Sequence, residues 1–198
     1  RRSPMPVAET DRVVQQISSA LQFAHRQGMI HRDIKPSNIM LDSDGEVKLM
    51  DFGLVRAGEL SHLTRSGTVL GTPQYMAPEQ ITGGQVDRRT DLYSLGVVIY
   101  ELLSGEAPFN RTTPMATAYA HVNEPPPPLG QRQSLTPKSV EAVVMKALAK
   151  DPAARYQTAT QLAQDFSVAA GGVMPAGLTA WDAGLAVTAA MQPPRRST

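Results

Sequence analysis

HRDIKPSN at residues 31–38, followed by DFG at residues 51–53, is the most informative part of this sequence. Both stretches are short, and the first is rich in charged and amide side chains. Brief apolar runs lie beside them, at residues 29–30, 39–41 and 47–50. A turn signal, DSDG at residues 42–45, separates the last two of these runs. We therefore expect a polar loop framed by short strands.

Two helices are expected on either side of this loop. From residue 10 to residue 28, apolar side chains recur at the spacing of an amphipathic helix, and Gly28 stands where a helix commonly ends. Residues 91–103 are apolar on nearly every side, and Gly105 follows them. This pattern is typical of a helix buried in a core, so we expect the central helix of the domain here.

Further elements follow from local signals. Residues 54–74 are rich in Ser, Thr and Gly with little periodicity, which predicts a mobile segment of about twenty residues. Four prolines at residues 125–128 predict an exposed extended connector. Thr136 is a candidate N-cap, with Pro137 in the first turn of the next helix. A plausible capping box at residues 158–161 begins a last helix.

Composition bounds the classes of function. The chain has 198 residues, 41% of them hydrophobic, which is enough for one domain with a buried core. The net charge of +1 predicts no nucleic-acid partner, and the absence of cysteine excludes disulfides and thiolate nucleophiles. The longest apolar stretch, near residues 95–103, is too short to span a bilayer, so no membrane contact is expected from this chain. We expect one domain at residues 1–170 and a flexible tail or juxtamembrane linker at residues 171–198.

The loop and the DFG stretch resemble the catalytic loop and metal-binding motif of protein kinases, in the family's order and separation. YMAPEQ at residues 75–80 and DPAARY at residues 151–156 are similar to the bacterial eukaryotic-like (Hanks-type) serine/threonine kinases. The resemblance covers residues 7–166. It implies a mainly α fold, the C-terminal lobe of the catalytic domain, in which a helical bundle surrounds a buried central helix and short β-hairpins frame the catalytic loop.

The resemblance also implies a catalytic role for each loop residue. Asp33 accepts the proton of the substrate hydroxyl, and Lys35 neutralises the transferred phosphate. Asn38 and Asp51 hold Mg²⁺, with Mn²⁺ as an alternative, and Met40 lies under the adenine of ATP. These residue types suit phosphoryl transfer, which needs a positioned hydroxyl, cationic charge and hard oxygen ligands for the metal. A lysine two residues after the aspartate resembles the serine/threonine branch, so protein Ser and Thr hydroxyls are the expected substrates.

Residues 71–79, GTPQYMAPE, resemble the end of an activation segment. Thr72 is expected to hydrogen-bond near Asp33 and Lys35. Three earlier hydroxyl groups are candidate phosphorylation sites, namely Thr64, Ser66 and Thr68. A phosphate there would pair with Arg32 and order the segment, whereas ordinary loop hydroxyls are the alternative reading for each.

Other matched residues are expected to be structural, namely His31, Phe52, Gly53, Glu79, Asp91 and Arg155. Asp91 would hold the catalytic-loop backbone from the central helix, and Arg155 would pair with Glu79. A buried ion pair of this kind supports a fold without taking part in chemistry. The histidines His25, His62 and His121 lack metal-ligand spacing and are expected to be ordinary, the last two in loop-like or surface settings.

Two functions stay open at this point. No glycine-rich phosphate loop and no strand lysine are found, so we expect the N-terminal lobe to be absent from this chain and to be its partner in the full-length protein. The chain is then a fragment of an active, ATP-dependent serine/threonine kinase, or a non-catalytic half-kinase that acts as a scaffold. The intact Asp33, Asn38 and Asp51 favour the first. The expected location is cytoplasmic, alone or as the cytoplasmic part of a membrane-anchored protein.

Overall fold

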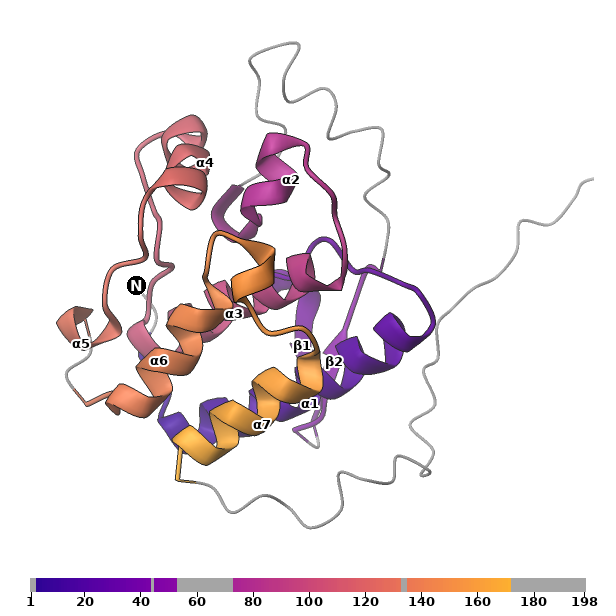
Figure 1. Ribbon diagram of the computed structural model, residues 1–198. Coiled ribbons are helices and arrows are strands. Elements are labelled where there is room, and N and C mark those ends of the chain that lie inside the picture. The colour runs from indigo at the N-terminus through magenta and orange to yellow at the C-terminus, as the bar shows by residue number, and fades with distance from the viewer. Residues whose placement is uncertain (1–2, 44, 53–72, 133–134, 172–198) are drawn as a thin grey trace, which may run out of the picture.

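The computed structural model describes residues 3–43, 45–52, 73–132 and 135–171. Within these ranges the chain is mainly α-helical (Figure 1). Helices α1 to α7 span Val7–Arg26, Pro78–Thr82, Arg88–Ser104, Pro114–Asn123, Leu129–Arg132, Lys138–Ala147 and Ala159–Ala169. Strands β1 (Ile39–Leu41) and β2 (Val47–Leu49) pair antiparallel. Short 3₁₀ helices lie at Pro36–Asn38, Pro73–Tyr75 and Pro152–Ala154.

Helix α3 runs through the middle of the molecule (Figure 1). It begins after Asp87, whose side chain accepts a hydrogen bond from the backbone N–H of Arg89 and so caps the helix. All side chains from Thr90 to Tyr100 are buried. The helix ends at Gly105, which has a left-handed backbone with a φ of 79°. The expected buried central helix is therefore confirmed.

Gly96 lets α3 approach α6 closely, because a Cβ at this position would lie 2.9 Å from the Cβ of Ala147. We expect Gly96→Ala to lower the free energy of unfolding by about 1–2 kcal/mol, since overpacking outweighs the gain in helix propensity. The matched control is Gly130→Ala in α5, where the nearest atom is the movable Nζ of Lys138. Denaturant unfolding compares the two variants, and equal stabilities would contradict this prediction.

Helices α1 and α7 lie side by side along one edge of the molecule (Figure 1). The buried face of α1 presents Val14, Ile17 and Leu21 to the core, as the helical spacing predicts. The Thr158 hydroxyl accepts from the backbone N–H of Gln161 and begins α7, which confirms Thr158 as the N-cap. The Gln161 side chain accepts from the backbone N–H of Gln157 instead of that of Thr158, so only this half of the predicted capping box is confirmed. This packing fixes the end of α1, from which the chain enters the polar loop.

Two expectations about local elements are wrong. Residues 29–30 form no strand, and the backbone that follows them is bound by the side chain of Asp91 instead of by a strand partner. Helix α6 begins at Lys138 with Pro137 as its N-cap, so Thr136 lies one residue too early to be the cap. The extended ψ of Pro137, 143°, delays the first helical turn by one residue. Among the described residues, no helix combines the length and apolar character needed to cross a membrane.

Candidate active site

Three of the predicted site residues meet in the loop between α1 and β1. The Nζ atom of Lys35 lies 2.7 Å from Oδ2 of Asp33. The side-chain amide of Asn38 donates to both the backbone oxygen and Oδ2 of Asp33, at 2.8 and 3.0 Å. About a third of each of the Asp33 and Lys35 side chains is exposed, 34% and 36%. A carboxylate, an ammonium group and an amide therefore gather where a substrate can reach them.

The 3₁₀ helix at Pro36–Asn38 brings Asn38 back to Asp33. Its first residue is a proline, which fixes the backbone, and the N–H of Asn38 donates to the Lys35 carbonyl at 3.0 Å. The amide nitrogen of Asn38 donates its hydrogen bonds to Asp33. Among the described residues, no hydrogen bond reaches the amide oxygen, which leaves a hard ligand for a metal.

Met50, the residue before Asp51, is bound to the loop. The N–H of Met50 donates to the Asn38 carbonyl at 2.9 Å, and Nε2 of His31 donates to the Met50 carbonyl at 2.9 Å. Asp51 itself is exposed and has a φ of 61°, so the chain turns sharply here. The ring of Phe52 then packs 4.5 Å from the ring of His31. The end of β2 is thereby anchored to the loop.

The donor groups suit Mg²⁺ brought in by a nucleotide. In the described ranges, no three His, Cys, Asp or Glu side chains gather into a metal cage. Magnesium rarely uses such cages, because it keeps waters and takes one or two protein oxygens plus substrate phosphates. The Asn38 amide and the exposed Asp51 carboxylate are oxygen donors of this kind, so the residues present fit the metal.

Asp91 holds the loop from the core. Its carboxylate is fully buried and accepts from the backbone N–H groups of His31, at 2.9 Å, and Arg32, at 2.8 Å. Nε2 of His25, at the end of α1, lies 2.7 Å from the same carboxylate. These three donors satisfy a buried charge that would otherwise be strongly unfavourable. The central helix thus fixes the backbone immediately before Asp33.

Arg32 has an unusual backbone, with a φ of 67°. A left-handed conformation is unfavourable for a residue with a Cβ and persists only where the surroundings enforce it. Asp91 binds the N–H of Arg32, and the side-chain amide of Gln80 donates to its carbonyl at 2.8 Å. Gln80 was not singled out from the sequence. It connects the start of α2 to the loop that carries Asp33.

Glu79 and Arg155 form a buried pair with two parallel contacts of 2.8 Å. Arg155 also donates to three backbone carbonyls, those of Arg89, Ala149 and Lys150. Burial raises the pKa of Glu79, but the hydrogen bonds and charge of Arg155 outweigh it, so the pKa lies below its ordinary value. The pair ties the chain after α6 to α2.

Several predicted positions are not tested by this geometry. Thr72, Gly53 and the three candidate phosphorylation sites lie outside the described residues. Met40 lies on β1 with 54% of its surface exposed, accessible to a ligand. The roles assigned to the site residues stay predictions.

Two histidines matter more than the sequence indicated. His25 contacts Asp91, as above. His121 was expected in a loop-like or surface setting, and this is wrong, because it is fully buried on α4. Burial and the nearby charge of Lys150 lower the pKa of His121 to about 4, so its ring is neutral at pH 7. The available signal was helical spacing, since His121 lies one turn beyond the buried Thr117.

Comparison with known proteins identifies the family. The family described as Protein kinase domain matches residues 1–167. The chain is 47% identical over 164 residues to the serine/threonine-protein kinase PknB of Mycobacterium leprae (strain TN), covering 82% of this chain and 26% of that protein. It is 49% identical over 156 residues to the probable serine/threonine-protein kinase PknB of Corynebacterium glutamicum, covering 76% of this chain and 24% of that protein.

A solved structure supports the same assignment. The crystal structure of the Mycobacterium tuberculosis PknI kinase domain matches with a TM-score of 0.66 and 28% identity, over 84% of this chain and 57% of that chain. The chain spans about a quarter of the length of the curated relatives it matches. It belongs to the protein kinase family, in the bacterial eukaryotic-like (Hanks-type) group of serine/threonine kinases.

Proposed function

We propose that this chain forms the C-terminal lobe of a kinase domain that transfers the γ-phosphate of ATP to Ser and Thr hydroxyls of proteins. The observation that carries the proposal is the meeting of Asp33, Lys35 and Asn38 within 3.0 Å contacts in one exposed loop. The family membership supports the reaction class. Lys35, two residues after Asp33, supports Ser and Thr as acceptors.

In this proposal, the substrate hydroxyl lies against the Asp33 carboxylate. Its oxygen forms a bond to the γ-phosphorus, the bond to the bridging oxygen breaks, and ADP leaves with that electron pair. Asp33 takes the hydroxyl proton. Lys35, already 2.7 Å from Asp33, places positive charge beside the moving phosphoryl group. Asn38 and Asp51 would hold Mg²⁺, which would supply further charge neutralisation on the phosphates.

The nucleotide needs additional parts, which we propose lie outside this chain. The 198 residues contain no Gly-x-Gly-x-x-Gly phosphate loop, the element that covers the ATP phosphates in protein kinases. An N-terminal lobe is therefore the proposed partner. In the full-length protein the active domain works in the cytoplasm, where ATP is available, and residues 171–198 serve as a tail or juxtamembrane linker.

The test compares two proteins. The full-length protein that carries this chain is incubated with γ-labelled ATP, Mg²⁺ and a peptide library with a central Ser, Thr or Tyr. We expect label on Ser and Thr peptides only, and negligible transfer by residues 1–198 alone. Transfer by residues 1–198 would contradict the need for another lobe. A full-length protein that binds ATP without transferring phosphate would contradict the kinase proposal.

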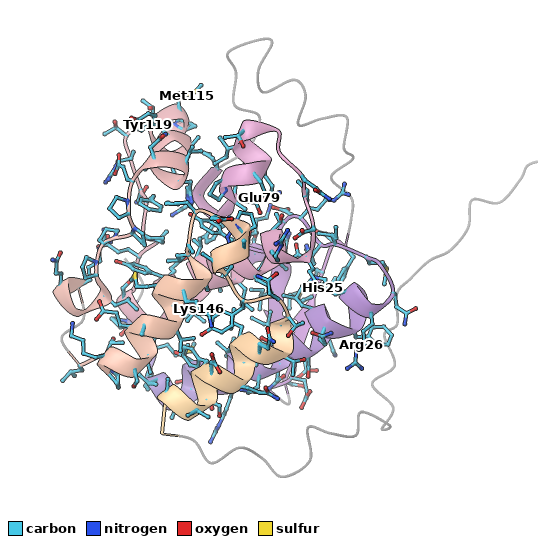
Figure 2. The ribbon with its side chains drawn as sticks, in the orientation of Figure 1. His25, Arg26, Glu79, Met115, Tyr119 and Lys146 are labelled. Carbon is cyan, nitrogen blue, oxygen red and sulfur yellow. The ribbon has the colours of Figure 1, made fainter. Side chains whose placement is uncertain are left out.

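One observation favours the scaffold as a second candidate. Met115 and Tyr119 lie on the outer side of α4 with 55% and 62% of their surfaces exposed (Figure 2). Exposed apolar side chains that lie together are typical of protein-binding surfaces. The same assay separates the candidates, because a scaffold would show no transfer in the full-length protein either.

A further inference from the structure

His121 connects three elements that are far apart in the sequence. Its Nε2 lies 3.0 Å from the carbonyl oxygen of Gln74, in the 3₁₀ helix Pro73–Tyr75. Its Nδ1 lies 2.9 Å from the hydroxyl of Tyr93 on α3. A carbonyl can only accept, so Nε2 carries the proton and Nδ1 accepts from Tyr93. A neutral ring therefore satisfies both partners at once.

The ring is held firmly in this orientation. The ring of Phe109 packs edge-on against it, with centroids 4.9 Å apart. Nζ of Lys150 donates to the backbone carbonyl of His121 at 2.6 Å and lies 4.4 Å from the centre of the Phe109 ring. The side chain of His121 is fully buried. Phe109 thus holds the ring of His121 and Lys150 holds its backbone, so α4 is fixed at this residue.

The segment that His121 contacts continues to the candidate active site. The carbonyl of Tyr75 accepts from the Ser94 hydroxyl at 2.7 Å, which fixes the next residue after Gln74 to α3. Five residues further on, Gln80 donates to the carbonyl of Arg32, the residue before Asp33. Residues 73–80 thus run from the His121 contact to the catalytic loop. Through Gln80, this segment is tied to the residue that directly precedes Asp33.

We propose that His121 is a positioning residue that holds residues 73–77 in the place where a protein substrate docks beside Asp33. The proposal rests on the proposed kinase function. It predicts an effect on the protein substrate and not on ATP, because none of the His121 contacts reaches the loop residues assigned to the nucleotide. Through the same ring, the position of α4 is linked to the active site.

Two replacements of His121 separate its two hydrogen bonds. In His121→Gln, the amide nitrogen reaches the place of Nε2 and still donates to the Gln74 carbonyl. In His121→Asn, the shorter side chain reaches only the place of Nδ1 and keeps the Tyr93 contact. We expect His121→Asn to raise KM for a Ser peptide about tenfold in the full-length kinase, the size expected for one lost buried hydrogen bond. KM for ATP is expected to stay unchanged, and His121→Gln to stay close to the wild type in both constants.

The control is Tyr93→Phe, which removes only the second contact and should leave KM for the peptide unchanged. Melting temperatures of all variants are measured alongside, to separate positioning from loss of folding. Equal KM changes in the Asn and Gln variants, or a parallel rise in KM for ATP, would overturn the proposal. If the wild-type protein transfers no phosphate, the kinase proposal fails on its own. The positioning role is then tested by hydrogen exchange of the backbone amides of residues 74–77. We expect these amides to exchange faster in His121→Asn than in His121→Gln. Equal exchange rates in the two variants would contradict the positioning role.

Discussion

Asp33→Asn is expected to lower kcat of the full-length protein by about a thousandfold. The asparagine amide keeps the size of the side chain but cannot take the proton of the substrate hydroxyl, and general base catalysis is worth roughly a hundred- to ten-thousandfold. The substitution also removes the charge that holds Lys35 at 2.7 Å, so the ammonium group loses its fixed position. Both effects act on the chemical step, so kcat is the constant that we expect to fall.

The measurement is phosphate transfer to a Ser peptide at saturating ATP, with the affinity for ATP measured separately. Glu46→Gln is the matched control, because this carboxylate is exposed on the hairpin and its removal makes the same change in charge. We expect the control to keep the wild-type kcat. An Asp33→Asn enzyme with kcat within about twofold of wild type would remove Asp33 from the role of base.

Arg155→Met is expected to have the largest effect on stability, a loss of about 3–5 kcal/mol in the free energy of unfolding. The substitution leaves the buried Glu79 carboxylate without its cation. It also leaves three backbone carbonyls without the donors that Arg155 provides. Denaturant unfolding followed by circular dichroism measures the change.

Two comparisons make this prediction specific. In the double variant Arg155→Met with Glu79→Leu, no unpaired charge remains, so we expect a smaller loss than in Arg155→Met alone. Arg111 pairs with Glu124 at the surface, where both side chains are about 40% exposed, 41% and 38%. Arg111→Met should therefore lose less than about 1 kcal/mol. Equal losses in Arg111→Met and Arg155→Met would show that burial does not set the strength of the pair.

The local part of the site could be predicted from the sequence. Asp33, Lys35 and Asn38 lie within six consecutive residues, and the proline that begins a short 3₁₀ helix between them brings the amide back to the carboxylate. The hairpin that returns the chain to Asp51 was also visible, because its turn residues separate two apolar runs. Spacing along the chain determines these contacts almost entirely.

The distant part could not be predicted, because it depends on how the helices pack. Gln80 reaches the carbonyl of Arg32 across 48 positions of sequence, and His121 reaches Gln74 across 47. A buried glutamine or histidine has the same appearance in a sequence as an exposed one. The mistaken strand at residues 29–30 has a related cause, since an apolar pair does not reveal that the next amides bind a carboxylate on α3.

Asp91 fixes the backbone path of the loop without using the side chain of Arg32. Asp91 accepts from main-chain N–H groups, which every amino acid except proline provides. These two hydrogen bonds therefore do not depend on which side chains stand at residues 31 and 32. A substitution of the Arg32 side chain would therefore keep this contact, and with it the path of the chain beside Asp33. The predicted pairing of Arg32 with a phosphate could then be removed by substitution without displacing Asp33.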